Sequence, residues 1–250
     1  MTEFYGSEPD IHKQYDTEGI GDMFFLNQKN KEMKRQLENV LFIAQGIIDK
    51  SETSGDFMHP IYSYIKAIGS SIRQKLLMQL ITGQEVAYVE ELFIDLGRDI
   101  KGENNQYIYN SFTIEDNEKI SISLKDNLVI PVAWEMSRFV NNITGIGTDC
   151  GNSFEFQESN HRSKLFLPIG VTIVYNGNHS ILTGIIKGEG VIHPTEMVDL
   201  APLYEKVKFD GTHFRDIVSN KVIQEVKNFE LGVIYEIGRL LIKTDISFLG

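Results

Sequence analysis

The residues most suited to chemistry are Gly177, Asn178, His179 and Ser180, in the segment VTIVYNGNHSILTGIIKGEG (171–190). The apolar run before them predicts a buried strand, and the amphipathic run after them predicts a short helix. The first turn of a helix has free backbone N–H groups and a partial positive charge. The Asn, His and Ser side chains add hydrogen-bond donors. The segment therefore indicates a site for a phosphate or carboxylate group.

The charge pattern around this segment favours an anionic ligand. The chain has 35 acidic and 24 basic residues, yet no acid occurs between Ser159 and Gly188. Arg162 and Lys164 lie in this window and would supply positive charge to the site. Buried strands also exclude acids, however, and Asn-Gly-Asn-His-Ser is good turn and N-cap chemistry in its own right. A purely structural turn at 177–180 is therefore the alternative.

An enzymatic version of the site would use His179 as a general acid or base, because histidine titrates near neutral pH. Glu189 or His193 would assist, and Glu189 is equally well explained as a solvated turn residue. Cys150, His161, His179 and His193 are spaced unlike any of the common metal-binding motifs. The sequence therefore predicts His179 and Glu189 as the catalytic candidates and predicts no metal site.

The order strand, Gly-x-His-Ser, helix over residues 171–185 resembles the phosphate-binding turn of the ParB/sulfiredoxin-like superfamily. Members of that superfamily carry Gly-x-His-Arg or Gly-x-Arg-Arg at this place. The resemblance covers residues 128–205 and implies a nucleotide as the ligand, with Mg²⁺ as a candidate companion and hydrolysis as an open extension. Ser180 stands where arginine is most common, so Arg162 would have to supply the cation from a neighbouring strand. The residues are also similar to a Gly-Asn-His-Ser signature of uncharacterised bacterial proteins, which implies no activity.

The hydrophobic periodicity changes along the chain and predicts an α+β fold. The predicted units are a polar acidic arm (1–28), a helical region (29–104), a small mixed α/β module carrying the candidate site (105–208) and a C-terminal helix that packs back (209–250). The helices could equally cover the sheet in one continuous domain.

Individual elements follow from the same patterns. Helices are predicted over 31–48, 61–80, 86–100, 131–143 and 222–240. Strands are predicted at 107–114, 119–124, 128–130, 154–157, 164–167 and 171–175. The polar turn at 115–118 predicts that the first two strands form a hairpin. The polar cluster from Asp210 to Asp216 is interpreted as the N-cap region of the last helix.

Composition narrows the classes of partner. A formal net charge of -11 repels the phosphate backbone, so broad non-specific binding to nucleic acid is not expected. Cys150 is the single cysteine, which excludes an intrachain disulfide and fits a reducing compartment. No signal peptide is evident, and no apolar run reaches the roughly 18 residues of a membrane span. We therefore expect a cytoplasmic protein without a membrane partner.

The alternative function belongs to a different class. The chain could be a non-enzymatic interaction or regulatory protein, for example of bacterial or phage defence type. In that reading the helical region binds a protein partner or a second copy of the chain, and the 177–180 turn is scaffold.

Overall fold

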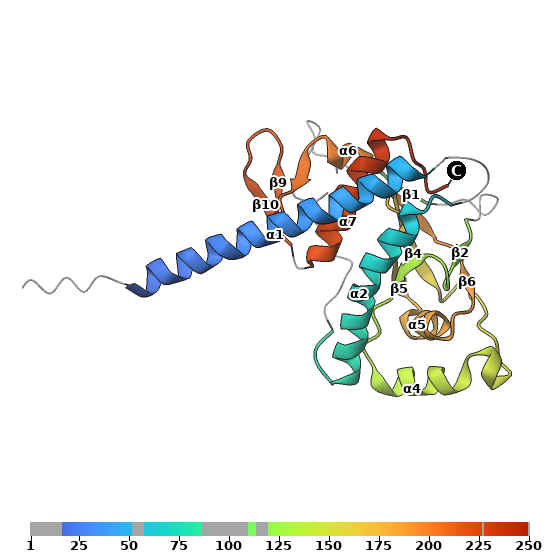
Figure 1. The fold of residues 1–250 in the computed structure, drawn as a ribbon. Coiled ribbons are helices and arrows are strands. Elements are labelled where there is room, and N and C mark those ends of the chain that lie inside the picture. Colours follow the sequence, from blue (N-terminus) through green and yellow to red (C-terminus); the bar gives the residue numbers. More distant parts are fainter. Residues whose placement is uncertain (1–16, 52–57, 87–109, 114–119, 227, 250) are drawn as a thin grey trace, which may run out of the picture.

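The computed structural model describes residues 17–51, 58–86, 110–113, 120–226 and 228–249 (Figure 1). The helices are α1 (Thr17–Lys50), α2 (Ile61–Ile81), α4 (Met136–Gly145), α5 (Asn178–Lys187), α6 (Ala201–Tyr204) and α7 (Phe229–Lys243), with a 3-10 turn, η2, at Thr148–Cys150. The strands are β1 (Asn110–Thr113), β2 (Ile122–Ser123), β3 (Leu128–Ile130), β4 (Arg162–Leu167), β5 (Val171–Asn176), β6 (Val191–Ile192), β7 (Glu196–Asp199), β8 (Val207–Phe209), β9 (His213–Asp216) and β10 (Val222–Glu225). The predicted α+β class is confirmed.

The strands form three sheets. The largest has five strands in the order β1-β7-β4-β5-β3, in which β5 runs antiparallel to β4 and parallel to β3. β8, β9 and β10 form an antiparallel meander, and β2 pairs with β6. Residues 171–174 of β5 are all buried because this strand is covered on both faces. The buried strand therefore holds the start of the following helix, α5, in place.

Two apolar clusters lie on opposite faces of the five-stranded sheet. On β4, Phe166 belongs to a large cluster shared with α1, α2 and α7, and its neighbour Leu165 belongs to a smaller cluster. This alternation follows the two-residue period of a strand. Ile181 anchors α5 in the smaller cluster. The N-terminal helices and the sheet thus share one core, while α5 packs on the other face.

The first helix starts earlier than the pattern predicted. α1 begins at Thr17, within the segment interpreted as an arm, and residues 1–16 lie outside the described residues. Its N-terminal end projects from the body of the molecule (Figure 1). The helix rests on the turn between β8 and β9, because a Cβ on Gly211 would lie only 3.0 Å from the Lys34 Cα. The predicted helix over 86–100 falls almost wholly outside the described residues.

Four local predictions were wrong. β1 pairs with β7 and β2 pairs with β6, so the described parts of the two predicted hairpin strands, 110–113 and 120–124, do not pair with each other. Residues 154–157 form no strand, and residues 222–225 form β10, so the last helix begins only at Phe229. The Asp210 carboxylate accepts hydrogen bonds from the Thr212 and His213 amides in the β8–β9 turn. In each case a long-range pairing or a side-chain hydrogen bond overrides the local pattern.

The helix predicted over 131–143 also begins late, at Met136. The preceding residues are extended because their N–H groups bond to α5 rather than to a helical turn. The Val132 N–H donates to Asn178 Oδ1 at 2.7 Å, and the Glu135 N–H donates to His179 Nε2 at 3.1 Å. The extended segment before Met136 matters for function, because these two hydrogen bonds hold the start of α4 beside the candidate site.

Candidate functional site

Gly177 makes the turn from β5 into α5. Its φ is 79°, a left-handed conformation that favours glycine. A Cβ at this position would lie 2.5 Å from His161 Cδ2 and 3.0 Å from the Asn160 carbonyl oxygen. Glycine is therefore required here, and it places residues 178–180 in the first turn of α5, as predicted.

The N-terminus of α5 is open. The first helical hydrogen bond runs from the Ile181 N–H to the Gly177 carbonyl at 3.1 Å, and no side chain caps the helix. The N–H groups of residues 178–180 have no hydrogen-bond acceptor in the described part of the chain. These donors stand at the positive end of the helix dipole.

Asn178 and His179 are almost completely buried and hold the segment before α4. His179 is 6% exposed, and Trp134 lies edge-on to its ring with 4.8 Å between centroids. Because His179 Nε2 accepts the Glu135 N–H, the neutral ring carries its proton on Nδ1. No hydrogen bond joins this Nδ1–H to another described residue, and the atom is open to solvent rather than buried. The Nε2 atom of His179 thus has a structural role, and its Nδ1–H is free to donate to a ligand.

The ionisation state of His179 follows from its surroundings. Burial lowers its pKa, and the nearby Arg138 lowers it further, while Glu135 acts in the opposite direction. His179 is therefore a neutral donor near pH 7 rather than a cation.

Ser180 is held by His161, a residue to which sequence reasoning gave no role at this turn. His161 Nδ1 accepts the Gln157 N–H at 2.9 Å, so its proton is on Nε2 and points at Ser180 Oγ, 2.8 Å away. Ser180 Oγ in turn donates to the Gly177 carbonyl at 3.0 Å. A nucleophilic serine would need the opposite direction, with histidine as acceptor. The pair therefore fixes the turn, and burial lowers the pKa of His161.

Two adjoining hollows open beside the α5 N-terminus, with volumes of about 230 and 290 Å³. The first is lined by Trp134, Arg138, Asn142, Asn160, Asn176 and residues 177–180. The second is lined by Asn142, Ile146, Asn152, Ser153, Phe154, Glu155, Gln157, Asn160, His161 and Ser180. They share Asn142, Asn160 and Ser180, so we treat them as one site, the amide groove.

The cation of the amide groove comes from α4. Arg138 lines it, pairs with Glu135 at 2.8 Å, and remains 63% exposed along its side chain. Arg138 and Asn142 are four residues apart and share one face of α4, a signal that the sequence contained. Arg162, by contrast, is exposed and stands opposite Asn176 in the β4–β5 register. Lys164 pairs with Glu196 at 3.1 Å. Neither Arg162 nor Lys164 lines the groove.

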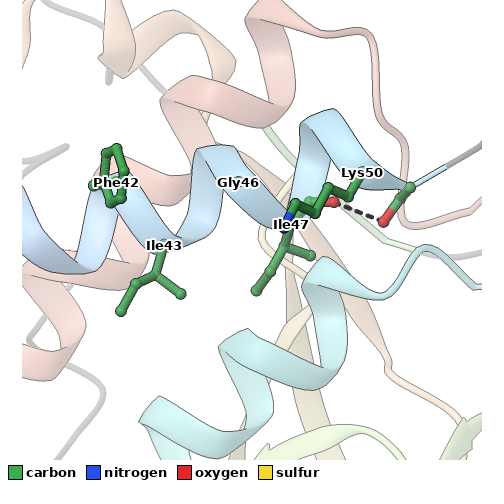
Figure 2. Close-up of a pocket in the computed structure, with 6 residues that line it drawn as sticks. Phe42, Ile43, Gly46, Ile47 and Lys50 are labelled. Atoms are coloured by element: carbon green, nitrogen blue, oxygen red, sulfur yellow. Dashed lines mark hydrogen bonds between the residues drawn. The ribbon is translucent and has the colours of Figure 1, made fainter.

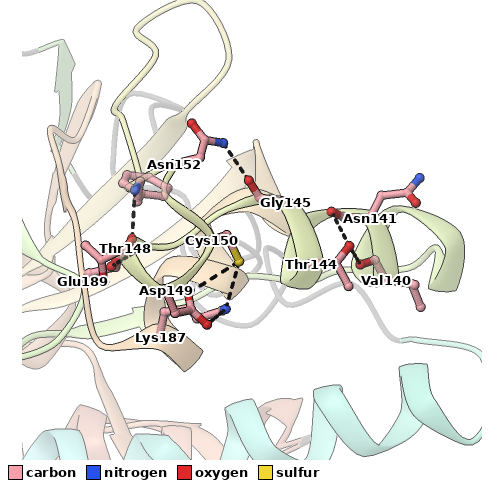
Figure 3. A network of polar contacts seen from close by, with 11 residues as sticks. Val140, Asn141, Thr144, Gly145, Thr148, Asp149, Cys150, Asn152, Lys187 and Glu189 are labelled. Carbon is pink, nitrogen blue, oxygen red and sulfur yellow. Dashed lines mark hydrogen bonds and ion pairs between the residues drawn. The ribbon is translucent and has the colours of Figure 1, made fainter.

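The other catalytic candidates lie elsewhere. Glu189 accepts the Phe154 N–H at 2.9 Å and the Thr148 N–H at 3.0 Å, so both carboxylate oxygens clamp the loop around η2 (Figure 3). These hydrogen bonds lower the pKa of Glu189, the one from Phe154 most. His193 Nδ1 lies 3.0 Å from the Ile120 carbonyl oxygen. Neither Glu189 nor His193 lines the amide groove.

Neither a metal-binding cluster nor a membrane-spanning helix is found among the described residues. No three or more His, Cys, Asp or Glu side chains gather there as a metal site would need. No described helix combines the length and the apolar character of a membrane span.

The chain belongs to a family whose model bears the description "Family of unknown function (DUF6710)", and the match extends over residues 22–248. The amide groove lies wholly inside the matched region. Neither the curated proteins nor the solved structures include a significant match to this chain.

Proposed function

We propose that this protein binds a nucleotide or another small phosphorylated ligand in the amide groove, with the phosphate at the N-terminus of α5. The carrying observation is that three backbone donors without acceptors, at residues 178–180, open on a hollow lined by a cation. The largely buried His179 gives independent support, because it lines the hollow and its Nδ1–H has no partner among the described residues. An occupant with acceptor oxygens would satisfy these donors.

The phosphate would be held by charge-assisted hydrogen bonds. Backbone N–H groups at a helix N-terminus, together with a guanidinium, match the oxygens of a phosphate group. Arg138 would supply the guanidinium that the Ser180 position lacks. The remainder of the ligand would lie among the amide side chains, beside Trp134, which is 53% exposed. An aromatic ring at the edge of a polar groove suits stacking against a base.

A relationship to the ParB/sulfiredoxin-like superfamily is part of this proposal. The order β5, Gly177, α5 supports it, and a cation from α4 takes the place of the arginine after the histidine. We restrict the proposal to binding, because the unprotonated nitrogen of His179 is occupied by the Glu135 N–H. Hydrolysis and a role for Mg²⁺ stay predictions from the resemblance.

The test uses Trp134, the single tryptophan of the chain, as a built-in probe. Its fluorescence is titrated with nucleoside mono-, di- and triphosphates and with cyclic nucleotides, with and without Mg²⁺. We expect a saturable change, and an Arg138→Gln variant that binds about tenfold more weakly or worse, as for the loss of a hydrogen bond to a charged group.

Arg35→Gln is the matched control. Arg35 is also exposed and also pairs with a glutamate three residues earlier, Glu32 at 2.9 Å, but it lies on α1. Equal weakening in both variants, or no saturable change with any nucleotide, would overturn the proposal.

A second candidate function is self-association through α1. Phe42 and Ile43 are 81% and 50% exposed and line a hollow with Gly46 and Ile47 (Figure 2). Large exposed apolar side chains grouped on a helix are typical of protein interaction sites. Sedimentation velocity of the wild-type chain and of Phe42→Ser tests it. A dimer that Phe42→Ser dissociates supports this role, and a monomer at all concentrations contradicts it.

A further inference from the structure

We propose that the amide groove selects a ligand with a single negative charge, a phosphodiester such as a cyclic nucleoside monophosphate, over nucleoside mono-, di- and triphosphates. This inference rests on the proposed function and names the ligand class for the same groove. It follows from the balance of charges around the groove and from the groups that line the rest of it.

The side chains around the groove are nearly neutral in total. Of its lining residues, Arg138 and Glu155 are charged. Glu135 lies 2.8 Å from Arg138 and offsets it. Among the described residues, no further Lys or Arg lines the groove. One arginine thus stands against two glutamates, and no excess cation is left for a highly charged ligand.

The net attraction for an anion therefore comes from the α5 N-terminus. A helix end acts as roughly half an elementary charge, and the three free N–H groups add hydrogen bonds. His179 contributes a neutral donor, because burial holds its pKa below the ordinary histidine value. Together, the helix end, the three N–H groups and the neutral His179 donor can balance about one negative charge on a ligand. A phosphate monoester carries about -1.5 to -2 charges at pH 7. The charge beyond the first would have no cation to balance it and would be repelled by Glu155 and Glu135.

The neutral part of the ligand faces amides. Asn142 and Asn160 line both hollows, and neither side chain has a hydrogen-bond partner among the described residues. Each amide has both donors and an acceptor, the combination that reads the edge of a nucleobase. The two hollows together reach the range of small-ligand pockets, roughly 300 to 1,000 Å³. A base linked to a singly charged phosphodiester fits both halves of the groove.

The test measures affinities of the full chain for cyclic AMP, AMP and ATP at one fixed ionic strength, by Trp134 fluorescence and by calorimetry. The cyclic GMP, CMP and UMP series covers other bases. We expect the best cyclic nucleotide to bind about tenfold or more tightly than its own mono- and triphosphate. If the open phosphates bind equally or better and Arg138→Gln still weakens them, charge selection is refuted while nucleotide binding stands. If no nucleotide binds, both proposals fail.

A charge substitution sharpens the result. Glu155→Lys turns the one lining carboxylate into a cation. It should strengthen AMP binding roughly threefold or more beyond any gain for cyclic AMP, because the attraction grows with ligand charge. Glu158→Lys is the matched control, since Glu158 is exposed in the same loop and does not line the groove. An unchanged ratio of AMP to cyclic AMP affinity in Glu155→Lys would refute the inference.

Discussion

The two ends of α5 are treated in opposite ways. At the C-terminal end Gly188 has a left-handed φ of 68°, and the Glu189 N–H returns to the Gly184 carbonyl at 3.0 Å. Lys187 pairs with Asp149 there, and Glu189 clamps the neighbouring loop (Figure 3). At the N-terminal end Gly177 is also left-handed, but the N–H groups of residues 178–180 are left open.

The proposed ligand site explains this difference between the two helix ends. Helix ends ordinarily find partners in side chains, solvent or ligands. The chain satisfies one end of this ten-residue helix with its own groups and leaves the other end facing a polar groove, which is what the proposed ligand site requires. The predictions below test whether the two ends differ in this way.

The largest expected effect is that of Gly177→Ala. The new Cβ would collide with His161 and would hold alanine in a left-handed conformation, so we expect a loss of about 3 kcal/mol in the free energy of unfolding. Gly188→Ala is the matched change at the other end, where φ is similar but nothing lies within 4 Å of the new Cβ. It should cost about 1 kcal/mol. Urea unfolding measures both, and equal losses would contradict the close packing at Gly177.

Asn178→Ala should have the next largest effect. It leaves the buried Val132 N–H without its acceptor, at a cost of about 1–3 kcal/mol. Asn176→Ala, two residues earlier, removes an exposed amide that lines the groove and has no partner among the described residues. It should change stability by less than about 0.5 kcal/mol and should weaken ligand binding instead. An Asn178→Ala protein of unchanged stability would show that the hydrogen bond from Val132 to Asn178 does not hold the segment before α4 against α5.

The pH dependence of stability should differ between the two ends. Burial lowers the pKa of His161 below 6.5, so the unfolded chain binds the proton first, and stability falls as the pH drops below 6.5. The pKa of Glu189 is lowered below 4.5 by the Phe154 and Thr148 amides, so its contribution is lost only below pH 4.5. His161→Gln should reduce the slope of the unfolding free energy between pH 6.5 and 5, to which the buried His179 also contributes, and Glu189→Gln should leave that slope unchanged. Identical profiles for the two variants would contradict this assignment.

The strand-turn-helix unit was predictable because its signals are local. The apolar run, Gly177 and the closing Gly188 give the bounds of β5 and the end of α5 within one residue, whereas α5 begins three residues before the predicted start at Ile181. The groups that complete the site were not, because they arrive through long-range contacts. Arg138 reaches the groove only because residues 131–135 are extended, and that conformation depends on Asn178 and His179 accepting their N–H groups.

The two histidines illustrate the same limit. His161 and His179 both stand in the acid-free window, and sequence alone cannot tell which ring nitrogen each one has free. The structure gives His161 two partners, Gln157 and Ser180, whereas the Nδ1–H of His179 has no partner among the described residues. Their different roles come from tertiary neighbours and not from their spacing.

The smallest expected effect is that of Lys187→Gln. It removes the pair with Asp149, whose side chain is 62% exposed, at the closed end of α5, so the loss of stability should be slight and should vanish in about 1 M salt. Nucleotide affinity should be unchanged, because Lys187 does not line the groove. Arg138→Gln and Lys187→Gln change the net charge equally. If both weakened nucleotide binding to the same extent, the cation would act through the overall field of an acidic protein and not through a contact at the open end of α5.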